Sequence, residues 1–233
     1  MSWFRQLKRY IHMAPPPKIT KAAVTTEVVA FNANVTRARD LYEKIVWHGY
    51  TGTGQATATK LNNPDTRDVA QFIFFEIAAK FVDFAKFIFQ VEVRARLQVT
   101  ATRSAFVMGD LDNGLNNKLG WGSPQRLKER GHNLFGPTSF FGDLVDQLGN
   151  PTYRTLVSAH TVRNRIAHDG GAAQVKFVKL LEGDGVPINV RQGMSVGRFL
   201  RDYPDGTART DRNFFRYLAG YEDFATKAGV ALP

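Results

Sequence analysis

The chain has 233 residues, and its 31 lysines and arginines outnumber its 21 aspartates and glutamates, giving a formal net charge of +10. Such an excess favours a polyanionic partner, either nucleic acid or an anionic membrane, with simple solubility as the alternative explanation. Because the sequence contains no cysteine, it excludes disulfide bonds, thiol catalysis and cysteine-ligated zinc, and it fits a cytoplasmic protein. No uncharged run is long enough to span a membrane.

The first part of the chain predicts two helical segments joined by a loop. Residues 1–17 form a short basic amphipathic segment that ends in a run of prolines. We expect it to fold back onto its own domain or a dimer mate, and docking on a membrane surface is the alternative. A long helix is expected over residues 19–48, followed by a loop rich in glycine and threonine over residues 50–63. The apolar residues of the first segment are Trp3, Phe4, Leu7 and Ile11.

The most apolar segment, residues 69–91, is expected to form a helix at the centre of a bundle, capped by Asn63 or Asp65. Residues 91–101 alternate apolar and polar side chains as a strand does, but they follow this helix without a breaker, so we favour a helix. The aromatic residues expected in the core are Phe72, Phe74, Phe75, Phe81, Phe84, Phe87 and Phe89.

The second half predicts shorter elements. Residues 109–136 are expected to be irregular apart from one short helix. Two segments, 174–181 and 186–190, flank a turn sequence and predict a small β-hairpin. Taken together, the chain is expected to be mainly α, a helical bundle forming a single domain over residues 1–233. Helices are expected over residues 124–130, 139–148, 152–168, 196–203 and 211–228.

The candidate site is the hexad at the end of the helix expected over residues 152–168, namely Arg163-Asn164-Arg165-Ile166-Ala167-His168. Residues four apart lie about 40° apart around a helix axis, and residues five apart about 140°. Asn164 therefore shares a face with His168 and with His160. Arg163 and His168 point to different sides unless the helix end unwinds or a second subunit brings their partners together.

The surroundings of the hexad suit a helix end on a core. Ala159, Val162 and Ile166 form an apolar stripe that can face the interior. Gly170 and Gly171 are expected to stop the helix through a left-handed residue, which leaves His168 in its last turn. A metal site is not expected, because His160 and His168 would lie roughly 12 Å apart along the axis.

Arg163-Asn164 followed by Ile166-Ala167-His168 resembles the R-x4-H motif of the HEPN family. In that family a polar residue usually follows the arginine, and the histidine lies four to six residues beyond it. The resemblance implies a helical bundle that forms a homodimer through the motif helix. It also implies a metal-independent endoribonuclease without a cofactor. Similar proteins act in toxin–antitoxin pairs, anti-phage defence or RNA processing, so an antitoxin or defence-system partner is implied as well.

Carried over to this chain, the resemblance assigns His168 as general base or acid, Arg163 as the group that holds the scissile phosphate, and Asn164 as the residue that orients the ribose or the histidine. His160 and Arg165 would contact RNA, although for His160 we favour packing at the dimer seam with its ring nitrogens satisfied. Some HEPN toxins carry a tyrosine, modified by a partner enzyme, where this chain has Gly170. This departure argues against control by such a partner.

A different class of function fits the same residues. An Arg-Asn pair near a helix end can serve capping, and a histidine there is often a surface residue. The alternative is therefore a non-catalytic helical module that binds RNA or a protein through its basic surface.

Overall fold

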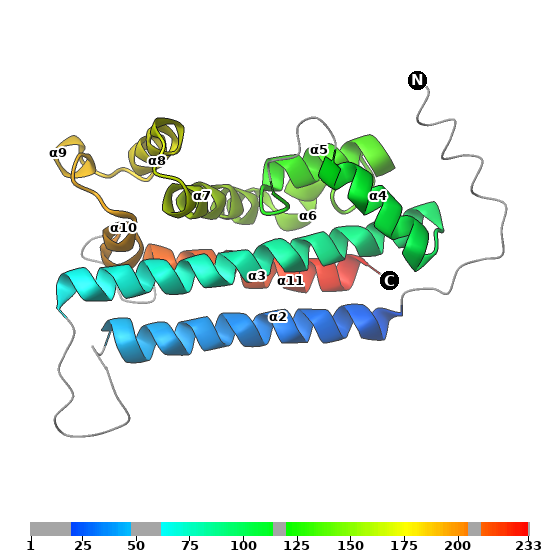
Figure 1. Ribbon diagram of the computed structural model, residues 1–233, viewed down its shortest axis with the longest axis horizontal. Coiled ribbons are helices and arrows are strands. Elements are labelled where there is room, and N and C mark those ends of the chain that lie inside the picture. The colour runs from blue at the N-terminus through cyan, green and yellow to red at the C-terminus, as the bar shows by residue number, and fades with distance from the viewer. Residues whose placement is uncertain (1–19, 48–61, 114–119, 205–210, 233) are drawn as a thin grey trace.

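The computed structural model describes residues 20–47, 62–113, 120–204 and 211–232. The amphipathic segment predicted at residues 1–17, and nearly all of the loop predicted at 50–63, lie outside these residues. The described residues form helices and no strand, so the predicted mainly α fold is confirmed. Figure 1 shows four long helices side by side, with α2 and α7 running opposite to α3 and α11. Their bounds are α2 Lys21–Leu41, α3 Asn63–Leu97, α7 Asn150–Ala167 and α11 Asn213–Ala231.

Polar side chains set the starts of the first two long helices. Thr20 accepts a hydrogen bond from the Ala23 N–H of α2 at 3.3 Å, and Asn62 accepts one from the Asp65 N–H of α3 at 2.8 Å. The cap predicted at Asn63 or Asp65 is wrong, because Asn62 has the extended backbone that an N-cap needs and both predicted residues lie inside the helix. At its other end α2 continues into a π-helical turn, Tyr42–Trp47 (η1 in the order of elements).

The ambiguous stretch after the phenylalanine-rich segment is helical, as predicted, up to Leu97. Gln98 then adopts a left-handed conformation with φ of 50° and ends α3. The irregular structure predicted from residue 109 is wrong at its start, because α4 spans Ala101–Asn113. The short helix predicted at 124–130 is confirmed and runs further, as α5, Pro124–Phe135. The helix predicted at 139–148 shrinks to α6, Leu144–Leu148.

The β-hairpin predicted after the motif helix is wrong. Its two segments lie in or beside α8 (Gly171–Gly183) and the one-turn helix α9 (Ile188–Arg191), which precede α10 (Val196–Asp202). Phe177 and Leu181 are the buried residues of α8, and their spacing of four fits a helix facing the core. Gly185 has a φ of +72°, so the glycine that indicated a hairpin turn instead ends a helix.

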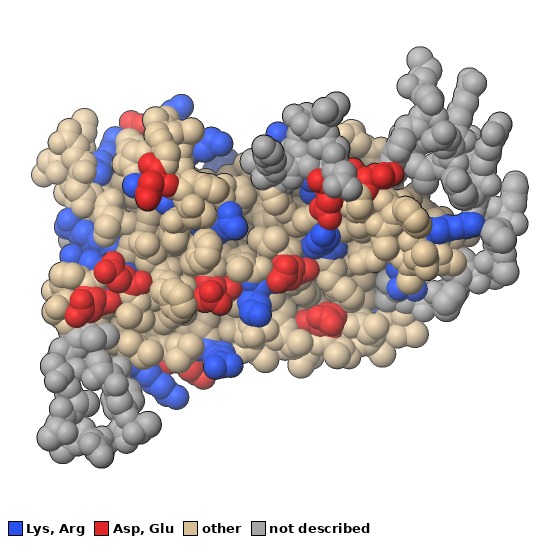
Figure 2. All heavy atoms as spheres, in the orientation of Figure 1, with Lys and Arg blue, Asp and Glu red and all other residues tan. Residues whose placement is uncertain are grey.

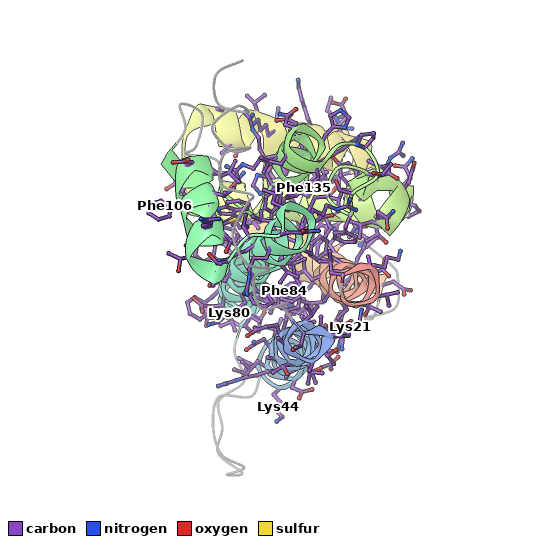
Figure 3. The ribbon with its side chains drawn as sticks, turned by 90° about the vertical axis from the view of Figure 1, so that its right-hand side faces the viewer. Lys21, Lys44, Lys80, Phe84, Phe106 and Phe135 are labelled. Carbon is purple, nitrogen blue, oxygen red and sulfur yellow. The ribbon has the colours of Figure 1, made fainter. Side chains whose placement is uncertain are left out.

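Aromatic side chains of α3 form the centre of the core. The ring of Phe81 stacks on Tyr221 of α11 with centroids 4.4 Å apart, and Phe84 stacks on Phe31 of α2 at 4.5 Å. Viewed along the bundle, Phe84 lies between the helices while Phe106 projects outward (Figure 3). Of the seven predicted core phenylalanines, Phe72 is the exception, because 64% of it is exposed. Fully buried are Phe74, Phe81, Phe84 and Phe89, whereas Phe75 and Phe87 are partly buried.

Charged side chains of both signs are scattered over the face shown in Figure 2. On this face, basic side chains gather at the end of the bundle where α10 lies (Figure 2). Every described helix, including the 35 residues of α3, lacks an apolar stretch of the length that a membrane crossing requires. Among the described residues, no group of three or more histidine or acidic side chains lies close enough together to hold a metal ion.

Candidate functional site

The hexad lies at the end of α7, on the side of the bundle away from α2 (Figure 1). The helix α7 begins at Asn150, directly after Gly149, and has Pro151 in its first turn. Leu156, Ala159 and Val162 are buried, and Ile166 packs partly buried against the core. The predicted apolar stripe is therefore confirmed, and it holds the polar residues between these positions near the surface.

Three polar side chains of α7 form one chain of hydrogen bonds. The Arg163 Nη1 donates to Asn164 Oδ1 at 3.2 Å, and Asn164 Nδ2 lies 2.9 Å from His160 Nε2. The guanidinium of Arg163 also lies over the ring of Phe75 on α3, 5.5 Å from its centroid, and its Nε is buried without a hydrogen-bond partner. Arg163 is thus held between its neighbour on the helix and an aromatic ring, with an unused N–H donor.

This chain of bonds fixes the protonation of His160. Because arginine can only donate, the Asn164 atom facing Arg163 is the oxygen, and the amide nitrogen faces the imidazole. His160 Nε2 therefore accepts, and the ring proton of the neutral form lies on Nδ1. The pKa of His160 is lowered from its ordinary value of 6.5 to about 4, mainly by burial and in addition by the charges of Arg163 and Lys176, while a hydrogen bond with the Gly122 backbone acts in the opposite direction. His160 is neutral at pH 7.

This lowered pKa predicts a loss of stability in mild acid. Because the folded-state pKa of His160 lies below its unfolded value, the unfolded chain takes up the proton first as the pH falls. The stabilisation is complete above pH 6.5 and is lost progressively toward pH 4, by on the order of 2–3 kcal/mol. We expect urea unfolding at pH 7 and pH 4.5 to show this loss, and the His160→Gln variant to show less of it.

A matched variant controls this measurement. His132 is exposed in the last turn of α5, so His132→Gln should keep the full pH-dependent loss. Equal losses in the wild type and in His160→Gln would contradict the assignment of this pH dependence to His160.

The helix ends one residue before His168. The backbone of His168 is extended, with φ of −139° and ψ of 120°, and its N–H donates to the Asn164 carbonyl oxygen at 3.0 Å. The predicted position in the last helical turn is therefore wrong. The predicted left-handed glycine stop is also wrong, because Gly170 has a φ of −67° and Gly171 opens α8. The helix stops because the chain turns directly into the next helix.

Arg165 joins this exposed end. Its Nη1 donates to the His168 carbonyl oxygen at 3.1 Å and to Asp169 Oδ1 at 3.3 Å. These bonds use the backbone of His168 and leave its imidazole exposed at the helix end. Among the described residues, no hydrogen bond connects the His168 ring to the side chains of Arg163 or Asn164. The structure thus joins Arg163, Asn164 and His160, and it places His168 and Arg165 beside them at the helix end.

Several contacts of this site could not be found from the hexad. Phe75 of α3 lies under the guanidinium of Arg163. Gly122, in the turn before α5, forms a backbone hydrogen bond with His160, and the charge of Lys176 on α8 lowers the pKa of His160. Tyr221 of α11 lies near enough for the charge of Arg163 to lower its pKa, although burial has the larger, raising effect. These residues are far from the hexad in sequence, and no local pattern marks them.

The fold and the site define an all-α protein with a polar cluster at the end of one long helix. Comparisons with family models, with curated proteins and with solved structures found no match for the chain.

Proposed function

We propose that the chain is a metal-independent endoribonuclease of the HEPN type that acts as a homodimer. The observation that carries the proposal is the end of α7. There the Arg163–Asn164 pair is fixed by packing and hydrogen bonds, and the helix ends at Ala167 with the imidazole of His168 exposed. Arginine binds phosphate through its fork of N–H donors, and histidine transfers protons. Arg163 and His168 therefore supply the two groups that RNA cleavage requires.

In the proposed reaction the 2′-oxygen of a ribose attacks the adjacent phosphorus and its proton passes to His168. The bond from phosphorus to the 5′-oxygen of the next nucleotide breaks, and that oxygen takes up a proton. The products are a 2′,3′-cyclic phosphate and a 5′-hydroxyl end. In this proposal the guanidinium of Arg163 binds the phosphate oxygens, where negative charge develops. Asn164, which already bonds Arg163, keeps that guanidinium in place.

A second copy of the chain completes the site in this proposal. Within one chain, no described hydrogen bond joins the side chain of Arg163 to the ring of His168. A two-fold axis near the end of α7 would place the histidine of one copy beside the arginine of the other. Arg165, on the same part of α7, would then contact the RNA strand, as the resemblance also implies for His160. In this structure, however, both ring nitrogens of His160 are used by Asn164 and the Gly122 backbone, so its role would be to hold Asn164 in place. The proposal places the enzyme in the cytoplasm as a toxin or anti-phage effector, restrained by an antitoxin or a defence-system partner.

The test is incubation of the purified protein with RNA in excess chelator. We expect cleavage with 2′,3′-cyclic phosphate ends, and no cleavage of 2′-O-methyl RNA, which lacks the attacking hydroxyl. Arg163→Ala should lower the rate by about 10²–10³-fold, the effect of removing one charge-stabilising donor. Arg154→Ala is the matched control, because Arg154 is an exposed arginine earlier on the same helix. Cleavage of both RNAs at equal rates, or a requirement for added metal, would reject the mechanism.

A non-catalytic RNA-binding module is the second candidate. It is favoured by the packing of the cluster, because His160, Asn164 and Arg163 bond one another and Arg163 lies against Phe75, which are contacts that a purely structural role also produces. In that case RNA would bind in a salt-dependent manner and remain intact, and overexpression would not arrest cell growth. Growth arrest by the wild type but not by His168→Ala would favour the nuclease.

A further inference from the structure

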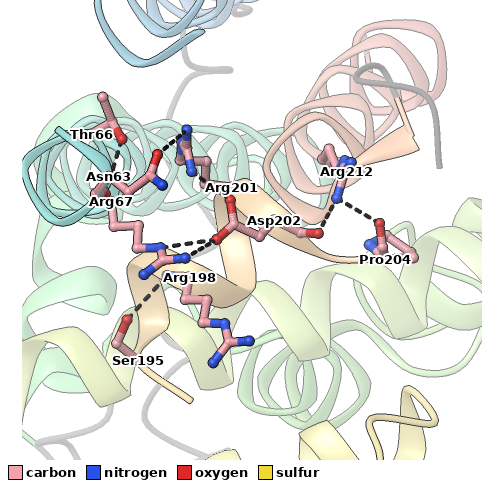
Figure 4. A network of polar contacts seen from close by, with 9 residues as sticks. All are labelled: Asn63, Thr66, Arg67, Ser195, Arg198, Arg201, Asp202, Pro204 and Arg212. Carbon is pink, nitrogen blue, oxygen red and sulfur yellow. Dashed lines mark hydrogen bonds and ion pairs between the residues drawn. The ribbon is translucent and has the colours of Figure 1, made fainter. Parts of the chain in front are cut away.

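Four arginines lie at the end of the bundle around α10, one on α3, two on α10 and one directly before α11 (Figure 4). Arg67 of α3 donates from Nε and Nη2 to Asp202 Oδ2 at 2.9 and 2.7 Å, and Arg201 donates from Nη1 to Asp202 Oδ1 at 2.7 Å. Arg212, the residue before α11, donates to the carbonyl oxygens of Asp202 and Pro204. A single carboxylate therefore serves two guanidinium groups at once, and a third binds the backbone beside it.

The close packing of α10 on α3 creates this cluster. Gly197 of α10 is fully buried, and a Cβ atom at this position would lie 2.2 Å from the Arg67 carbonyl oxygen. Only glycine permits that approach, which brings Asp202 within reach of Arg67 although 135 residues separate them in sequence. The arrangement is thus fixed by backbone packing, and it does not depend on flexible surface side chains meeting by chance.

The charges of the cluster are not balanced by its own contacts. Arg198, one helical turn before Arg201, leads away from Asp202, and no contact reaches its guanidinium in Figure 4. Among the described residues, Asp202 is the only carboxylate that forms an ion pair with Arg67, Arg198 or Arg201. Asp65 and Asp68 are exposed on α3 and form no described ion pair with the cluster.

Two buried donors beneath the cluster have no partner. The hydroxyl of Tyr42 and the Nε of Arg201 are both buried without a hydrogen bond. Tyr42 is completely buried, stacks on Phe214 with centroids 4.0 Å apart, and begins the π-helical turn η1. Burial raises the pKa of its hydroxyl, and the charges of Arg201 and Arg212 lower it while those of Asp202 and Glu43 raise it. π-helical turns recur at functional sites.

The cluster lies at the same end of the bundle as the motif. The last turn of α7 lies at this end of the bundle, and α10 packs against both α3 and α7. We infer that Arg67, Arg198 and Arg201 form a binding site for phosphodiester groups of RNA, continuing along the strand from the end of α7. The inference rests on the proposed function, because that function names RNA as the partner. Multiple arginine forks suit phosphate oxygens, which accept paired N–H donors.

The test measures binding of a single-stranded 2′-O-methyl oligoribonucleotide, which the proposed reaction cannot cleave, over a range of salt concentrations. Arg198→Ala should weaken binding and reduce the slope of log affinity against log salt by about 0.7, the value for one phosphate contact to a single strand. Arg198→Glu should weaken binding further. Because the Arg198 guanidinium has no described partner, both variants should unfold at the wild-type temperature. Arg154→Ala removes the same charge toward the other end of α7 and should change the slope by less than half as much.

The outcomes separate this inference from the proposed function. Equal affinities for Arg198→Glu and Arg154→Ala would overturn the phosphate site, even if the wild type cleaves RNA. A specific loss of binding in the Arg198 variants would support the site, even if no protein cleaves RNA. Binding of inorganic phosphate or a mononucleotide as tightly as the oligonucleotide would overturn RNA as its occupant.

Discussion

Replacing His168 with alanine is expected to lower the rate of RNA cleavage by about 10²–10⁴-fold, the usual contribution of one general acid or base. The expected change in stability is small, below about 0.5 kcal/mol, because the substitution is at the surface. Both described hydrogen bonds of His168 use its backbone, namely the N–H to Asn164 and the carbonyl from Arg165, and alanine keeps them. Initial rates with labelled RNA in excess chelator, measured together with thermal unfolding, check both expectations.

The matched control is His132→Ala. His132 is also an exposed histidine at the end of a helix, α5, and its carbonyl oxygen accepts a hydrogen bond from the Gly136 N–H, where that of His168 accepts one from the Arg165 side chain. Its replacement should leave the cleavage rate unchanged. If His168→Ala cleaves RNA as fast as His132→Ala does, then His168 is not the catalytic base or acid. A rate loss accompanied by an equal loss of folded protein would indicate a structural role.

The long helices could be predicted because their apolar residues recur at helical spacing, whereas the cap of α3 and the glycine stop of α7 were predicted at the wrong residues. The continuation of α3 to Leu97 follows from the absence of a breaker before Gln98. The hairpin prediction failed for a related reason. The turn sequence at Gly183 to Gly185 was located correctly, but a glycine with positive φ serves a helix end as well as a β-turn, and the choice depends on burial of Phe177 and Leu181.

The candidate site was predictable only in its local part. Arg163, Asn164 and His168 stand within six residues, so their spacing could be read directly. Phe75 lies 88 residues before Arg163 in sequence, and its ring reaches the guanidinium only because α3 packs against α7. Asp202 and Arg67 are likewise joined by tertiary packing. Contacts of this kind depend on how whole helices dock, and residue patterns within one helix do not contain that information.

The burial of Glu92 within the apolar helix α3 could not be predicted from the sequence either. Glu92 stands between Val91 and Val93, and no part of it is exposed. Its carboxylate accepts hydrogen bonds from the N–H groups of Phe140 and Phe141, at 2.8 and 3.1 Å, and one from Arg96 Nε at 2.8 Å. A glutamate that interrupts the apolar sequence of α3 thus satisfies two backbone donors in the turn before α6.

Glu92→Leu is therefore expected to lower the free energy of unfolding by about 2–6 kcal/mol, because two buried backbone N–H groups each lose their acceptor at a cost of about 1–3 kcal/mol. The leucine adds apolar surface, but it leaves the N–H groups of Phe140 and Phe141 buried without an acceptor and deprives Arg96 of its carboxylate. Denaturant unfolding monitored by circular dichroism measures the change. Glu76→Leu is the matched control, because Glu76 is exposed on the same helix, and its effect should stay within about 0.5 kcal/mol. Unfolding of Glu92→Leu at the wild-type denaturant concentration would show that the turn before α6 finds other acceptors, and Glu92 would then not be what holds it to α3.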